Sequence, residues 1–511
     1  MRRVKLLTAL VLTAALVGPA LAGATATDTA PPRHALDPAP DPAHVALRAA
    51  VERLGNNDAG GALPFLQKIL ADPSFAQFTS DEQHGVLRAA TYAELNTGHS
   101  GDAEPLAKRL TLMPQADALD WTLALSAALV LHDGAEAGEA TTMLARRWPD
   151  EFKKLDERAV SYAVELADKV PDRALRLGLL SSLYDDRWPA DHFEDHGDTW
   201  RKLALLLIEG GDLDRAGEIA ANIRIPHVIA AIRFDRRFDA IFGKDPAAFD
   251  PQKAVDVFIG ERRARAEANP EKLEDQNALA QELVFTGRDQ EALAVTDTLL
   301  AKANSPAGKA PAFTDKDAQI QWTYDIRARA LWDLGRFGEA AEVMATAMQH
   351  QRKGGDTISQ TVNLGAMLDE LGQPSKALAV IAQVGPGSPF GELQAQGVRA
   401  DAYSQLGDKE KLAKCIDFAR THLKDDPQTL EDMLIESDDL DGAAALYVQR
   451  LQDPDMRDQA LASLQDWLPP ALTPVTKELR HRFEQVRARP EVQEAIKAVG
   501  RIETFPFNQY A

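Results

Sequence analysis

The sequence of 511 residues holds a single cysteine, Cys415, and has a deficit of positive charge. One thiol excludes a disulfide within the chain and any metal site built from several cysteines, so packing must supply the stability of the fold. Lys and Arg number 57 against 78 Asp and Glu, which gives a net charge of −21. A surface this acidic repels phosphate backbones, so we expect no nucleic-acid partner.

Sequence patterns typical of β-strands are almost absent as well. We find no sustained alternation of β-branched and polar residues between turn dipeptides. From about Ala43 onward, runs of roughly 12 to 15 residues instead carry apolar positions at the i, i+3, i+4 and i+7 spacing of an amphipathic helix. Hydrophobic residues make up 45% of the chain, which argues against wholesale disorder. The sequence therefore predicts an all-α protein.

A long apolar run occurs only near the start, within residues 1–22 (MRRVKLLTALVLTAALVGPALA). Three basic residues precede this run, and an Ala-Leu-Ala sequence at its end suits signal peptidase. The run is shorter than the ~20 residues that a membrane-spanning helix needs. We expect a signal peptide cleaved after Ala22, a Pro- and Ala-rich flexible linker over residues 23–42, and a periplasmic or secreted protein with no stable membrane span. An uncleaved membrane tether is the alternative.

The helical runs form pairs that share one spacing of small and large residues. In the clearest pair, the small Ala328 allows two helices to touch and Leu331 fills the gap between them. Gly335 permits a tight turn, and Ala340 packs the returning helix against the first. A helix pair of this kind buries only one face by itself, so neighbouring pairs must stack to make a continuous core.

The same spacing recurs through most of the chain. The clearest turns lie at Gly335, Gly372 and Gly407, with weaker copies around Gly287 and Gly211 and degenerate ones around Gly134, Gly98 and Gly55. This recurrence resembles the tetratricopeptide repeat (TPR), a helix-turn-helix unit of about 34 residues, in a protein of the exported bacterial type. The resemblance spans most of residues 43–460 and is clearest over 270–425.

The resemblance implies a TPR-like α-solenoid, a superhelical array of antiparallel helix pairs. We expect degenerate repeats over residues 43–224, a junction over 225–270 and clearer repeats over 271–460. Residues 461–511 are expected to form a helical cap over the last repeat. Within this cap, the sequence predicts a polar helix near Val475–Ala488 and a shorter one over Glu491–Val499.

The resemblance also implies a concave groove, lined by the first helix of each pair, that binds a protein or peptide partner. The family's groove positions fall here on Trp322, Asp325, Arg329, Trp332, Asp333, Asp369, Glu370, Asp401 and Gln405. Trp322 and Trp332 are the favoured anchors, because aromatic side chains dominate contact energy at interfaces. Packing of both tryptophans between neighbouring repeats is an equally good interpretation. The implied function is a non-enzymatic binding scaffold, with a role in cell-envelope assembly.

One pair of histidines leaves an enzymatic alternative open. His192 and His196 stand four residues apart among acidic residues, a spacing at which two imidazoles can hold a metal ion on one helix face. A metal-dependent hydrolase carried on a helical platform is therefore the second function class. We find no motif for a catalytic nucleophile, and Cys415 is expected to be buried and inert. No catalytic residue, metal or cofactor is predicted.

Two further clusters have ordinary structural interpretations. Residues 438–442 (DDLDG) share part of a calcium loop but lack its alternating ligands and closing Glu, so an acidic turn between helices is expected. Residues 233–238 alternate three Arg with two Phe, a combination that can stack on bases. The aspartates at positions 235 and 239 offset much of that charge, so we expect a packing segment there.

Overall fold

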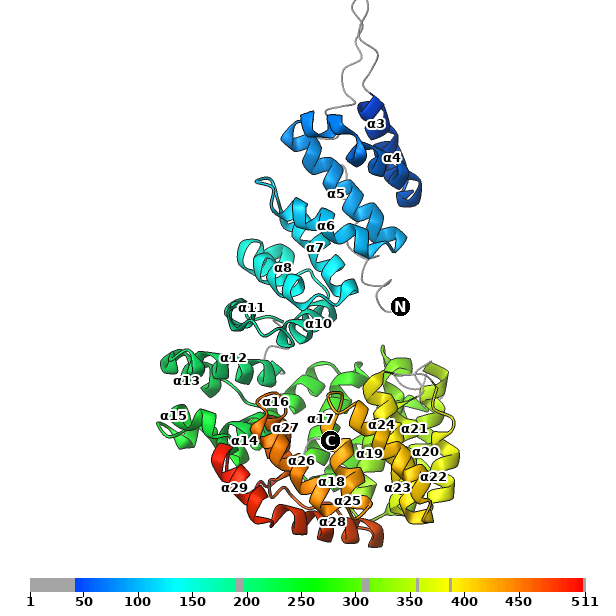
Figure 1. The fold of residues 1–511 in the computed structure, drawn as a ribbon. Coiled ribbons are helices and arrows are strands. Elements are labelled where there is room, and N and C mark those ends of the chain that lie inside the picture. The colour runs from blue at the N-terminus through cyan, green and yellow to red at the C-terminus, as the bar shows by residue number, and fades with distance from the viewer. Residues whose placement is uncertain (1–41, 190–195, 306–312, 355–357, 386–387, 509–511) are drawn as a thin grey trace, which may run out of the picture. The chain divides into compact units, whose positions relative to one another are not determined.

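The computed structural model describes residues 42–189, 196–305, 313–354, 358–385 and 388–508 (Figure 1). The predicted signal peptide, and the linker up to residue 41, lie outside these ranges. Within them the predicted all-α, TPR-like fold is confirmed: strands are absent, and the β-structure consists of two isolated bridges, Asp235–Gly500 and Asp466–Thr504. The chain divides into two units, residues 1–207 and 208–511.

The first unit is a succession of helix pairs, in which most helices pack on their neighbours along the chain. Figure 1 shows it from blue to green-cyan. Its helices are α3 (Pro42–Gly55), α4 (Ala59–Ala71), the 3-10 helix η1 (Pro73–Gln77), α5 (Ser80–Thr97), α6 (Ser100–Thr111), α7 (Ala118–Leu131), α8 (Gly134–Arg147), α9 (Pro149–Phe152), α10 (Glu157–Asp168), α11 (Arg173–Asp185) and most of α12 (Gly197–Glu209).

The second unit begins within α12 and contains the clearest repeats, coloured green to red in Figure 1. Its helices are α13 (Leu213–Ala221), α14 (Pro226–Phe234), η3 (Arg236–Phe238), α15 (Asp239–Phe242), η4 (Pro246–Phe249), α16 (Pro251–Ala268), α17 (Leu273–Phe285), α18 (Asp289–Ala303), α19 (Lys316–Asp333), α20 (Phe337–Gly354), α21 (Ser359–Glu370), α22 (Pro374–Ile381), α23 (Pro389–Leu406), α24 (Lys409–Thr421), α25 (Pro427–Glu436), α26 (Leu440–Gln452), α27 (Arg457–Ser463), α28 (Pro474–Arg487) and α29 (Pro490–Val499).

The turn glycines of the clear repeats behave as the sequence predicts. Gly335, Gly372 and Gly407 all have positive φ, between 69° and 75°, a backbone conformation in which the Cβ atom of other residues is strained. In each case the turn joins two helices that pack against each other: α19 with α20, α21 with α22, and α23 with α24. Tight turns at these positions therefore make the antiparallel pairs.

Of the three degenerate turns in the first unit, the one at Gly98 has the predicted positive φ (85°), whereas the other two turn at residues other than the expected glycine. His132 (φ 58°) takes the left-handed position rather than Gly134, and Asn57 (φ 57°) takes it rather than Gly55. Gly134 is buried at the start of α8, where a Cβ atom would lie 2.2 Å from the backbone oxygen of Leu166. This glycine is therefore needed for close helix packing and not for the turn.

The segment expected to join the two arrays, residues 225–270, lies wholly within the second unit. The aromatic rings of Phe234 and Phe238 are buried, and two of the interleaved arginines, Arg233 and Arg237, make ion pairs. Arg233 Nε donates to Glu503 at 2.7 Å, and Arg237 Nη2 donates to Asp235 at 2.6 Å. These arginines hold protein segments together, consistent with a packing role.

Residues 464–508, here called the C-terminal arm, do more than cover the last helix pair. Its two helices, α28 and α29, match the two predicted there, and both pack on α26. The arm then returns to the start of the unit: Arg501 N donates to the backbone oxygen of Phe234 at 2.9 Å, and Asn508 N donates to that of Phe285 at 2.8 Å. The arm thus connects the last repeat of the second unit with its first helices.

Candidate functional site

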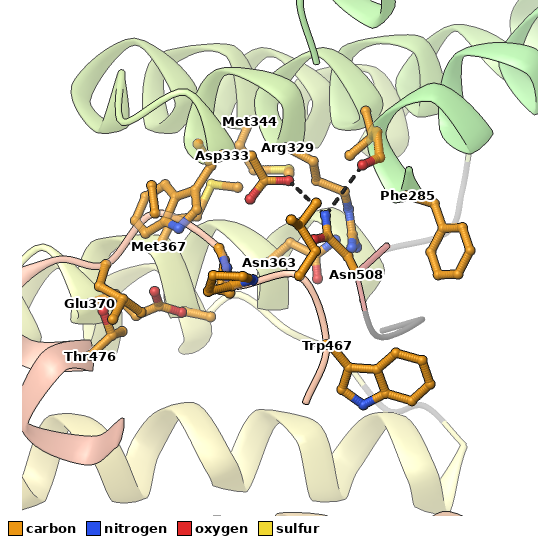
Figure 2. A pocket seen from close by; sticks show the side chains of 18 of the residues that line it. Phe285, Arg329, Asp333, Met344, Asn363, Met367, Glu370, Trp467, Thr476 and Asn508 are labelled. Carbon is orange, nitrogen blue, oxygen red and sulfur yellow. Dashed lines mark hydrogen bonds between the residues drawn. The ribbon is translucent and has the colours of Figure 1, made fainter. Parts of the chain in front are cut away.

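A cavity of about 550 Å³ lies between the repeats of the second unit and the C-terminal arm (Figure 2). On the array side, its wall comes from α17, α19, α20 and α21, and on the other side from the arm. The lining residues are Gln281, Val284, Phe285, Arg329, Trp332, Asp333, Met344, Asn363, Ala366, Met367, Glu370, Trp467, Leu468, Pro469, Pro470, Ala471, Leu472, Thr476, Arg480 and Asn508.

Aromatic packing and main-chain hydrogen bonds hold the arm against this wall. The Trp467 ring stacks on Phe505 with a centroid distance of 4.8 Å, and Phe507 lies 5.1 Å from Phe285 of α17. Leu468 N donates to the backbone oxygen of Phe507 at 2.9 Å. Because Phe505 and Phe507 are buried, the arm is part of the hydrophobic core and not a loose covering.

A buried carboxylate organises the polar part of the array wall. Asp325, with 2% of its surface exposed, accepts hydrogen bonds from Arg329 Nε at 2.7 Å and from Asn363 Nδ2 at 2.9 Å. Gln360 Nε2 adds a third bond at 3.3 Å. Asp325 therefore links α19 to α21 and fixes Arg329 in place, which explains why a charged group is tolerated at this depth.

Two further carboxyl groups, Asp333 on the cavity wall and Asp289, lie close enough for the charge of one to act on the other. Burial raises the pKa of Asp333, on the cavity wall, to about 6, and burial with the negative charge of Asp333 raises that of Asp289 to about 6 as well. Asn508 Nδ2 of the arm lies 3.4 Å from Asp333 Oδ2, as Figure 2 shows. Asp289 is 8% exposed, and its Oδ1 atom has no hydrogen-bond partner among the described residues.

Five more carboxyl groups form what we call the inner acidic cluster: Asp369, Glu370, Asp401, Asp432 and Glu436. They lie on α21, α23 and α25, the first helices of three successive pairs. α21 packs on α23, and α23 packs on α25. Besides burial, the negative charges of the cluster raise one another's pKa values. Glu370 also lines the cavity, so the cluster and the cavity are continuous.

The protein environment raises the pKa values throughout this cluster. Burial, followed by the negative charge of Asp401, raises the pKa of Asp369 to about 8 and that of Glu370 to about 7. Asp432 is exposed, yet the surrounding protein and the charge of Asp401 raise its pKa to about 7. Burial also raises the pKa values of Asp401 and Glu436, whose carboxyl groups share a hydrogen bond. The cluster thus holds protons well above the usual range for carboxylic acids.

The buried pair beside the cluster has a structural role. Glu431 and Arg450 form an ion pair, and both side chains are fully buried between α25 and α26. Burial raises the pKa of Glu431 to about 8, although the charge of Arg450 acts in the opposite direction. A pair with no access to solvent cannot meet a partner, so we exclude it from the candidate site.

The structure places the nine predicted groove residues in different surroundings. Arg329, Trp332, Asp333 and Glu370 line the cavity, whereas Asp325 lies behind its wall. Asp369 and Asp401 belong to the inner acidic cluster, and Gln405 Nε2 donates to the backbone oxygen of Asp369 at 2.9 Å. Trp322 is 37% exposed and is not among the lining residues.

The two tryptophans accordingly differ. Trp332 packs against Phe337 in an edge-on arrangement, with a ring distance of 4.8 Å, and also faces the cavity. It therefore combines the two interpretations that its sequence position left open: packing between helices and a wall position in the groove. Whether either tryptophan binds a partner stays a prediction.

Sequence reasoning missed the contribution of the arm and the last two acidic residues of the cluster, Asp432 and Glu436. A signal for the latter exists in the repeat. Asp401 precedes the positive-φ residue Gly407 by six positions, and Asp432 precedes Asp438, which also has positive φ (64°), by the same number. The turn glycines do not reveal this last repeat, because Asp438 takes the turn position there.

The other candidate clusters are structural where they are described. Asp439, in the acidic turn, caps α26 by accepting a hydrogen bond from Gly442 N at 2.9 Å. His196 Nε2 lies 3.4 Å from Glu157, while His192 falls outside the described residues. Cys415 is buried, and burial raises the pKa of its thiol, as expected for an inert cysteine.

No three His, Cys, Asp or Glu side chains in the ranges given above are arranged to hold a metal ion. None of the helices described there combines the length and the apolar character needed to cross a bilayer.

The chain is similar to several solved structures of helical-repeat proteins. The yeast Tom70 structure shares 13% identity over 89% of this chain and 92% of that chain, with a TM-score of 0.31. Cut9–Hcn1 from an APC/C hetero-tetramer shares 12% identity over 89% and 96%, with a TM-score of 0.29. The P58(IPK) TPR domain shares 14% identity over 81% and 100%, with a TM-score of 0.21. No family model and no curated protein sequence matches the chain. Scores of this size transfer no partner or site to it.

Proposed function

We propose that this protein is an exported, non-enzymatic, TPR-like scaffold that binds a protein or peptide partner at the inner face of its second unit. A role in cell-envelope assembly would follow from its location. The export part of the proposal rests on the sequence of residues 1–22, with its basic start, apolar run and small residues at the end.

The observation that carries the binding function is that an extended peptide already lies on this face. Residues 467–472 of the arm run along the cavity wall opposite α19 and α21. Asn508 adds a main-chain hydrogen bond to Phe285 and a side-chain bond to the backbone oxygen of Val284 at 3.2 Å. The end of α17 thus offers two backbone oxygens, and the cavity wall offers apolar surface, to a chain in extended conformation.

The cavity that the arm leaves open has both apolar and ionisable residues on its wall, as recognition sites do. Trp332, Met344 and Met367 provide apolar wall, while Asp333 and Glu370 place charged groups at separate points. A volume of about 550 Å³ holds a few side chains of a partner and not a folded domain. We therefore assign the cavity to side chains of a bound peptide segment.

Site-specific photo-cross-linking tests this function. A benzoylphenylalanine at Met367, on the cavity wall, should give an adduct of one defined size with a protein of the native envelope fraction. The same group at Phe390, which is 54% exposed and lies outside the cavity, serves as the control and should give no such adduct. Adding Glu370→Arg to the Met367 variant should remove the adduct. Equal adducts at both positions, or none at Met367, would overturn the proposal.

A further inference from the structure

We propose that the inner acidic cluster is a binding site for cationic side chains, so that the partner of the second unit is a basic peptide segment rich in Arg or Lys. This inference rests on the proposed function and specifies the chemistry of the partner. It concerns α21, α23 and α25, which carry the cluster beside the cavity.

The arrangement of the cluster provides the geometry. Glu370 stands on the cavity wall and is half-buried, as are Asp401 and Glu436 further along the array. Asp432 is exposed, so the row of carboxyl groups can be reached from solvent. A basic peptide that enters the cavity would therefore meet carboxyl groups from three successive repeats.

Unpartnered buried oxygens give a second, independent indication of a ligand. Asp369 is 2% exposed, and its Oδ1 atom accepts no hydrogen bond from any described residue, although its carboxyl group lies beside those of Glu370 and Asp401. Asp289, whose pKa is raised by burial and by the nearby charge of Asp333, likewise has an Oδ1 atom that accepts no hydrogen bond from any described residue. A buried acceptor without a donor is costly, and a cationic group of the kind we propose would supply a donor to each of these two oxygens.

The arm shows which cation fits this region. Arg480 of α28 lines the cavity, and Nη1 of Arg482 donates to the backbone oxygen of Glu436 at 3.0 Å and to that of Ile435 at 3.3 Å. A guanidinium group is thus already accommodated at the end of α25, but it contacts main-chain carbonyls and leaves the carboxyl groups of the cluster available. An incoming arginine can use the same approach to reach those carboxylates.

The spacing of the carboxyl groups favours an organic cation over a metal ion. Within the described ranges, no three of these side chains converge on one point. A guanidinium or ammonium group on a flexible stem needs only one or two carboxylates at a time, and several such groups along a peptide can follow the row. The site therefore suits a basic segment better than a divalent ion.

The test uses the full chain and a short fluorescent peptide of alternating glycine and arginine, with fluorescence anisotropy as the readout. A matched peptide carries citrulline, which keeps the shape of arginine without its charge. We expect the arginine peptide to bind and the citrulline peptide to bind at least about tenfold more weakly, as charge-pair contributions at interfaces imply.

Two matched double variants separate the cluster from the overall charge. Glu370→Gln with Asp401→Asn should weaken binding of the arginine peptide about tenfold. Glu267→Gln with Glu494→Gln removes two carboxyl groups at exposed positions of the same unit and should have less than about a twofold effect. Because the neutral side chains resemble the protonated carboxyl groups, the first variant should fold normally, which thermal unfolding checks.

The outcomes distinguish this inference from the function on which it rests. Equal losses in both variants, equal binding of the citrulline peptide, or no binding of arginine would overturn the cationic site. If the Met367 cross-link still forms in that case, the partner function stands and only its proposed chemistry is wrong. Cluster-dependent arginine binding without any Met367 adduct would instead overturn the partner function.

Discussion

The two units use the same helix pairs but complete them differently. In the first unit, α3 to α11 pack on near neighbours in the chain, and their core is built from segments close in sequence. In the second, the C-terminal arm returns to α14 and α17, and its aromatic residues join the same core as α19 and α23. The difference shows that a repeat array gains an enclosed site when a segment outside the repeats closes it.

Among the tests of this difference between the units, Phe507→Ala should cause the largest loss of stability. The ring is fully buried between the arm and Phe285, so we expect a loss of about 3–5 kcal/mol in the free energy of unfolding of the second unit. Urea denaturation followed by hydrogen exchange would assign the loss to residues 208–508. Leu66→Ala is the counterpart in the first unit and should lower protection there. A loss shared equally by both units in either variant would contradict the comparison.

Gly287→Ala and Gly372→Ala form the next test, because the two glycines have nearly the same φ, 70° and 69°. Alanine in this conformation costs roughly 1–2 kcal/mol at either position. At Gly287, the new Cβ atom would also lie 2.5 Å from Leu468 Cδ2 of the arm, whereas nothing lies within 4 Å at Gly372. We expect an additional cost of about 1–3 kcal/mol for Gly287→Ala, measured as the difference between the two urea midpoints. Equal midpoints would mean that the arm does not pack closely against the turn at Gly287.

The stability of the second unit should fall as the pH rises. The pKa of Asp369 is raised from 3.8 to about 8 on folding, so the folded state binds this proton more tightly than the unfolded state. The stabilisation is fully present below about pH 4 and is lost as the pH rises through about 8. Allowing for screening by water in the cavity, we expect a decrease of about 2–3 kcal/mol between pH 5 and pH 8, measured by urea denaturation. Asp369→Asn should reduce this dependence, and an unchanged pH profile would contradict the raised pKa.

Loss of a helix cap should have the smallest effect on stability, and the effect should be the same in both units. Asp133 caps α8 by accepting a hydrogen bond from Glu136 N at 3.1 Å, and Asp439 caps α26 by accepting one from Gly442 N at 2.9 Å. Replacing either aspartate with alanine should cost about 1 kcal/mol, because the interaction is local. Hydrogen exchange at the two helix starts is the measurement. A much larger loss at Asp439 would show that the arm reinforces this cap.

The helices and most of their turns can be predicted from the sequence, whereas the candidate site can be predicted only in part. The spacing of Ala328, Leu331 and Gly335 predicts α19, its turn and its packing, because these depend on residues a few positions apart. The turns at His132 and Asp438 escape the pattern because both residues tolerate positive φ without being glycine. The repeat positions of Arg329 and Glu370 predict groove residues. Both line the cavity, and their binding role stays a prediction.

The arm could not be predicted in the same way. The bond from Arg501 N to Phe234, and that from Asn508 N to Phe285, join segments separated by most of the second unit. No periodicity connects such positions, since each contact depends on the accumulated geometry of all the intervening repeats. The arm's two helices are evident in the sequence, but its course across the inner face is a property of the assembled array.

The return of the arm also bears on the order in which the two units can fold. Residues 42–207 form helix pairs whose partners are close along the chain, so this unit can fold without waiting for distant segments. The core of the second unit is incomplete until residues 500–508 have docked, because Phe505 and Phe507 supply part of it. The second unit therefore depends on contacts that span most of its length.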